Sequence, residues 1–119
     1  MTIENNQVYH NANYGPDPHT GTHDMIIRNN NVHDNGAQGI CSLNCYNVLI
    51  ENNQIYNNGG AGIMFSRNMS NSVARNNIIF NEDKGILISQ SYYNNAISDS
   101  QYMGLMWYLA LQEIHSTLT

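Results

Sequence analysis

Ile50-Glu51-Asn52-Asn53-Gln54-Ile55-Tyr56 is one copy of a short motif that occurs four times in this chain. The other copies span residues 3–9, 27–33 and 74–80. The first asparagine of each pair falls at positions 5, 29, 52 and 76, so the step is 24, 23 and 24 residues. Self-similarity at a period in the twenties predicts a solenoid, in which each repeat buries its apolar face against its neighbours.

The apolar residues within each repeat indicate which kind of solenoid this is. A Gly-Ile pair recurs at positions 39, 62 and 85, and short runs rich in β-branched residues lie at 48–50, 63–65 and 86–88. Such runs, bounded by Asn, Gly and Ser, are typical of strands of a few residues separated by turns. We therefore expect an all-β fold, a parallel β-helix of about four coils, with coils stacked about 4.8 Å apart.

Asparagine supports the same interpretation. The chain has 21 asparagines, none of them after Asn95. At equivalent turns asparagine tolerates left-handed backbone angles, and stacked side chains can pair amide to amide along the column. We expect the asparagines to form such columns at the corners of the coil.

The domain organisation follows from the length of 119 residues, which allows at most one domain. Residues 1–100 are expected to form the coils, with 11–24 as an inserted loop that carries the site. Residues 101–119 lack the asparagine-rich pattern of the repeats. They either cap the open end of the β-helix or are unrelated to the fold. Because four coils are few for a solenoid with open ends, we expect the chain to be a fragment of a longer β-helix.

Composition limits the partners. The net charge is −5 with four basic residues, so no nucleic acid is expected to bind. An acidic polymer would be repelled on average, and a site for one must concentrate the few cations. The C-terminal apolar run is shorter than the ~20 residues of a membrane span, and no signal peptide is visible at the start. Cys41 and Cys45 are expected to be free thiols, with Cys41 in the core.

The candidate site lies in residues 11–24, which contain both prolines. Pro16 and Pro18 keep the backbone extended, so Asp17 and His19, two residues apart, point to the same side. A carboxylate beside an imidazole fixes its tautomer and supports its use as a base. Tyr14 can reach the same space as a second proton carrier. The alternative is that the segment is only a rigid loop between coils.

These residues resemble a known family. The stretch Tyr14-Gly15-Pro16-Asp17-Pro18-His19 is similar to the Tyr-Gly-Phe-Asp-Pro-His motif of mannuronan (alginate) C5-epimerases, which are right-handed parallel β-helices. The similarity extends over residues 11–95. It implies removal of the C5 proton of a uronate unit and its return on the opposite face, with His19 and Tyr14 as proton carriers and Asp17 positioning. It also implies an acidic polysaccharide partner and an extracellular, periplasmic or cell-surface location; no cofactor is implied, and a need for calcium is left open.

The chain departs from the family pattern at two places. Pro16 replaces the aromatic residue of the motif, and Gly60-Ala61 stand where some members have an Arg-His pair. Another group must then neutralise the substrate carboxylate. We expect Arg67 to do so, with Asn44 at the same place of the preceding coil as a second substrate-binding residue. A solvated surface arginine is the alternative.

A second function remains open beside the enzyme. The chain can instead be a non-catalytic carbohydrate-binding or surface β-helix module, in which the His19 segment is scaffolding. No metal site is expected, because the His and Met residues form no compact set of ligands.

Overall fold

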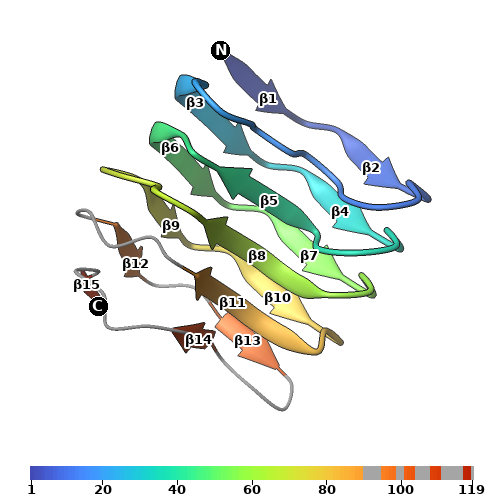
Figure 1. Cartoon of the computed structure of the whole chain (residues 1–119). Coiled ribbons are helices and arrows are strands. Elements are labelled where there is room, and N and C mark those ends of the chain that lie inside the picture. Colours follow the sequence, from blue (N-terminus) through green and yellow to red (C-terminus); the bar gives the residue numbers. More distant parts are fainter. Residues whose placement is uncertain (90–94, 99–100, 104–107, 111–116, 119) are drawn as a thin grey trace.

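The computed structural model describes residues 1–89, 95–98, 101–103, 108–110 and 117–118. The chain winds as a right-handed parallel β-helix, and its strands form three parallel sheets (Figure 1). No helix occurs in the described residues, so this part of the chain has no helical segment that could span a bilayer. The expectation of an all-β solenoid is confirmed.

From the second coil on, each complete coil contributes one strand to each sheet in a constant order, whereas the first coil has strands in the first two sheets only. The first sheet contains β1 (Thr2–Glu4), β3 (His23–Arg28), β6 (Tyr46–Glu51), β9 (Val73–Arg75), β12 (Ala96–Ser98) and β15 (Thr117–Leu118). The second contains β2 (Gln7–Tyr9), β4 (Asn31–His33), β7 (Gln54–Tyr56), β10 (Ile78–Phe80) and β13 (Gln101–Met103). The third contains β5 (Ile40–Leu43), β8 (Ala61–Ser66), β11 (Lys84–Ser89) and β14 (Tyr108–Ala110).

The core is a stack of aliphatic side chains that point into the coil. In the third sheet Ile40, Ile63 and Ile86 pair in register, and each is fully buried. Phe65 and Ile88, two residues further along their strands, also face inward because side chains alternate along a strand. Each fully buried side chain of this size stabilises the fold by roughly 1.5–3 kcal/mol.

The two members of each asparagine pair have different roles, one in turning the backbone and one in hydrogen bonding within the core. The first member turns the chain: Asn29 and Asn52 both have a φ of 57°. The second member points inward. Oδ1 of Asn53 accepts from the backbone N–H of Asn30 (3.0 Å) and from its Nδ2 (3.1 Å). The expected amide column therefore exists and satisfies backbone donors that would otherwise be buried without partners.

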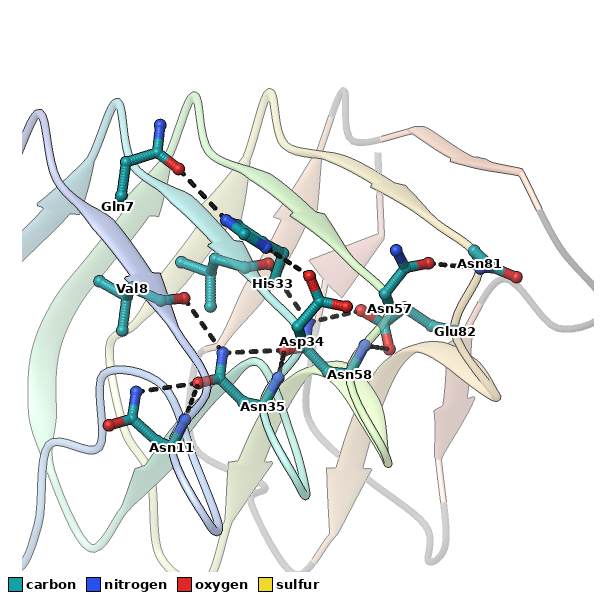
Figure 2. A network of polar contacts seen from close by, with 11 residues as sticks. Gln7, Val8, Asn11, His33, Asp34, Asn35, Asn57, Asn58, Asn81 and Glu82 are labelled. Carbon is teal, nitrogen blue, oxygen red and sulfur yellow. Dashed lines mark hydrogen bonds and ion pairs between the residues drawn. The ribbon is translucent and has the colours of Figure 1, made fainter.

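A second polar column runs through Asn11, Asn35, Asn58 and Glu82 (Figure 2). Oδ1 of Asn58 accepts from the backbone N–H (3.0 Å) and Nδ2 (2.9 Å) of Asn35. One coil further on, Glu82 takes the place of the asparagine: its carboxylate accepts from the backbone N–H (3.1 Å) and Nδ2 (2.7 Å) of Asn58. Burial raises the pKa of Glu82 to about 7. The repeat pattern did not predict a buried acid at this position.

Residues 15–19 do not stand out of the coil as an inserted loop would. The Gly15 N–H donates to the carbonyl of Gln38 (3.3 Å), and the carbonyl of Pro16 accepts from Cys41 N–H (3.0 Å). The carbonyl of Pro18 accepts from Leu43 N–H (3.1 Å). The segment thus lies beside β5 in the place of a third strand of the first coil, although its two prolines cannot donate hydrogen bonds to β5.

The C-terminal part continues the coils where it is described. β13, β14 and β15 pair in parallel with β10, β11 and β12, so each of the three sheets gains a strand. The rest of residues 101–119, on which the expectation of a cap depends, lies outside the described residues.

Candidate functional site

A hollow of about 220 Å³ lies on the outer face of the third sheet. Three consecutive coils line it, each with three residues: Tyr14, Asp17 and His19; Gln38, Cys41 and Leu43; Met64, Ser66 and Arg67. The structure therefore brings the three predicted catalytic residues and the predicted cation to one place.

The first coil presents Asp17 and His19 to the hollow because the two prolines that alternate with them face the interior. Pro16 and Pro18 are buried, whereas Asp17 and His19 are exposed on the outer side, as the spacing predicts. Tyr14 is 38% exposed at the start of the segment. The backbone beneath these side chains is held by its hydrogen bonds to β5.

The next two coils supply the floor. Cys41 pairs with Met64 and Leu43 pairs with Ser66 in the register of β5 and β8. The hydrogen bonds of the first coil place Asp17 next to Cys41 and His19 next to Leu43. These floor residues were not among the predicted site residues, although the two-residue alternation of both strands identifies them as outward-facing.

Burial raises the pKa of two groups that line the hollow, the Asp17 carboxyl and the Cys41 thiol. Partial desolvation raises the pKa of the Asp17 carboxyl, and the positive charge of a protonated His19 opposes this. Burial, followed by the charge of Asp17, raises the pKa of the Cys41 thiol to about 11. Cys41 is therefore protonated near neutral pH and is not a nucleophile.

Both cysteines are free, as expected, and both are buried, but Cys41 does not take the core position expected for it. Cys41 is 7% exposed yet points outward to the floor of the hollow, and is not an inward core thiol. The chain turns at Asn44 (φ 53°), so the two cysteines do not lie on one straight strand. The Cys45 thiol donates to the carbonyls of His19 (3.2 Å) and Leu43 (3.0 Å) and so ties the His19 corner to the second coil.

Arg67 differs from the other basic residues of the chain. It lies exposed at a corner where Arg67 and Asn68 both have positive φ (50° and 49°). The structure gives Arg67 no ion pair with any described carboxylate, whereas the other three basic residues are paired. Those pairs are Arg28–Glu4 (2.8 Å), Arg75–Glu51 (2.9 Å) and Lys84–Asp83 (2.7 Å). Arg67 is therefore available to an anionic ligand in the hollow.

Asn44 occupies the corner that matches Arg67 but does not line the hollow. Its backbone N–H donates to the carbonyl of Arg67 (3.0 Å), and its Nδ2 donates to Oγ1 of Thr20 (3.2 Å). The side chain is thus used within the protein. The structure does not bring Asn44 into the site with the other predicted residues.

Among the described residues that line the hollow, Asp17 carries the single carboxylate. Across the described residues, no group of three or more His, Cys, Asp or Glu side chains could hold a metal ion. The site as described is one of hydrogen-bonding, proton-transfer and cationic groups.

The chain is therefore a β-solenoid of three parallel sheets, and residues from successive coils line a hollow on one outer face. Residues 1–109 match the family described as right handed beta helix region, and the chain belongs to this family. No curated protein sequence matches the chain.

Two solved structures with the same fold come from Azotobacter vinelandii. The A-module of the mannuronan C-5 epimerase AlgE4 matches with a TM-score of 0.59 at 18% identity, over 99% of this chain and 51% of the module. The A-module of mannuronan C-5 epimerase AlgE6 matches with a TM-score of 0.51 at 16% identity, over 99% of this chain and 50% of the module. The chain thus spans about half the length of both modules. The expected mannuronan epimerase-like right-handed β-helix is confirmed as a fold.

Proposed function

We propose that this protein is a polyuronate C5-epimerase-like carbohydrate-active protein that binds an acidic polysaccharide in the hollow. The observation that carries the proposal is the gathering of Tyr14, Asp17, His19 and Arg67 around one hollow. The similarity of fold to epimerase modules supports the same proposal.

Arg67 accounts for binding of a negatively charged polymer by a protein of net charge −5. A uronate carboxylate placed against its guanidinium forms a charge-assisted hydrogen bond. The ion pair also withdraws electron density from the carboxylate, which makes the adjacent C5–H more acidic. Stabilising charge that develops in the transition state is usually the largest catalytic contribution.

The proton transfers then fall to His19 and Tyr14. In the proposed reaction His19 removes the C5 proton, and the electron pair of the broken C–H bond moves into the carboxylate to give an enolate-like intermediate. Tyr14 returns a proton to C5 from the opposite face, which inverts that carbon. Asp17 orients the imidazole. Expulsion of the 4-linked sugar from the same intermediate would give the lyase outcome.

The proposal uses no bound ion in any step. Calcium prefers six to eight oxygen ligands, and the lining residues that the structure describes offer one carboxylate, so these residues do not fit a calcium site.

The size of the hollow favours a second candidate, a non-catalytic carbohydrate-binding module. Its volume of about 220 Å³ is below the roughly 300–1,000 Å³ of typical ligand pockets. A site of this size holds part of one sugar unit and leaves the rest of the polymer on the open face.

The two candidates are separated by C5 exchange. Poly-mannuronate incubated with the protein in deuterated water should gain deuterium at C5, and His19→Ala and Tyr14→Phe should each abolish this gain. Binding without exchange by the folded wild-type protein would favour the binding module. Appearance of an unsaturated sugar end would identify elimination in place of inversion.

A further inference from the structure

A short aromatic column runs along the first sheet, one corner beyond the hollow. His23, Tyr46 and Ser70 occupy equivalent places in three successive coils. The rings of His23 and Tyr46 stack with their centroids 4.9 Å apart and their planes at 8°. At the next coil the stack meets serine, which has no ring.

The second sheet shows what a continued stack looks like. There, four rings follow one another with centroid separations of 5.1, 4.8 and 4.8 Å: Tyr9, His33, Tyr56 and Phe80. The inner rings of that column have both faces covered. In the first-sheet column the described residues place no ring against the face of Tyr46 that looks toward Ser70, and Tyr46 is 43% exposed.

Polar groups surround the open ring face unevenly. On the covered side Asp24 is engaged by Nδ1 of His23 (2.9 Å) and by Nδ2 of Asn47 (3.1 Å). The coil on the open side presents the corner 67–71, which contains Arg67, two exposed asparagines and Ser70, and contains no acid. Hydrogen-bonding groups and one cation therefore lie in the coil toward which the open face looks.

We propose that the open face of Tyr46 is a stacking subsite for a uronate unit next to the one held in the hollow. A pyranose has an apolar C–H face and a rim of hydroxyl groups. The C–H face would bury apolar surface on the ring, while the rim meets the amides and hydroxyl of the corner 67–71. This subsite rests on the proposed function and extends the hollow across one corner of the coil.

Two variants test the subsite from opposite directions. Tyr46→Ala removes the platform, whereas Ser70→Tyr places a ring where the stack now stops and so covers the open face. Both should weaken the binding of mannuronate oligosaccharides by roughly 10-fold, measured by isothermal titration calorimetry. Two controls should bind as the wild type does: Ser70→Ala, which leaves the face open, and Tyr9→Ala, which removes a half-exposed tyrosine from the other column.

The outcomes separate the subsite from catalysis. Wild-type affinity in a folded Ser70→Tyr variant, checked by circular dichroism, would overturn the subsite. If C5 exchange occurs in that variant as in the wild type, the proposed function stands without the subsite. If the wild type exchanges no deuterium and both Tyr46→Ala and Ser70→Tyr lose affinity, the subsite stands and the catalytic proposal fails.

Discussion

Replacing Glu82 by glutamine tests the energetics of the buried polar column (Figure 2). Glu82 is 7% exposed and accepts two hydrogen bonds from Asn58. Burial raises its pKa from 4.5 to about 7. The folded protein therefore binds this proton more tightly than the unfolded chain does.

The sign and size follow from that difference. The contribution of protonated Glu82 to stability is full below pH 4.5 and is lost as the pH rises through about 7. The interval between 4.5 and about 7, at ~1.36 kcal/mol for each pKa unit, corresponds to roughly 3 kcal/mol. Glutamine carries no charge and can accept both bonds on one oxygen, as Asn58 does from Asn35.

The assay is urea unfolding of both proteins between pH 4 and pH 8. Near pH 4 the two free energies of unfolding should agree, and by pH 8 Glu82→Gln should be more stable by up to roughly 3 kcal/mol. Taking the difference between variants removes the titration of all other groups. Parallel curves for the two proteins over this pH range would refute the reasoning.

A matched control makes the opposite change, from an amide to an acid, in the neighbouring asparagine column. Asn77 is fully buried and its Nδ2 donates to the carbonyl of Ile50 (3.0 Å). Asn77→Asp introduces a buried carboxyl group there and removes that donor. Its free energy of unfolding should fall relative to wild type as the pH rises, because the charged form is the costly one in the folded state.

Two further predictions concern the packing and the surface of the coil. Gly39→Ala should lower the free energy of unfolding by about 1–3 kcal/mol, because an added Cβ would lie 2.6 Å from the carbonyl oxygen of Gly62 and 2.7 Å from Ile55 Cγ2. Thermal unfolding should show little change for the control Gly60→Ala, whose nearest neighbour is the flexible Gln38 side chain at 3.1 Å; equal losses in both variants would contradict this account. Arg28→Gln, which breaks an exposed ion pair with Glu4, should lower the free energy of unfolding only slightly, and less still in high salt, because solvent and salt screen such a pair. A larger, salt-independent loss in urea unfolding would show that the pair is more than a surface contact.

Much of the fold could be predicted because its determinants are short-range and periodic. An Asn-Asn pair every 23 or 24 residues specifies a turn by the backbone preference of the first asparagine alone. Strand alternation then assigns Ile50 and Ile63 to the core. The pattern also disfavours a one-residue slip in register, since such a slip would turn these side chains out of the core.

The site could be predicted only in part, for the same reason. Asp17 and His19 lie two residues apart in an extended segment, so their common direction is a local property. Asn44 was assigned to the site from its place in the repeat, but its side chain donates a hydrogen bond to Thr20 in the preceding coil. Glu82 escaped notice because its role depends on Asn58, one full coil away.

The sequence by itself determined the winding: its period, its corners and the side of each strand that faces the core are all set by neighbours within a few residues. Only the tertiary structure decided which outward side chains share a hollow, which acid is buried and which ring face stays open. These depend on contacts between residues about one coil apart. Side-chain packing and burial between coils decide these features. The local pattern cannot, because it is the same at every repeat.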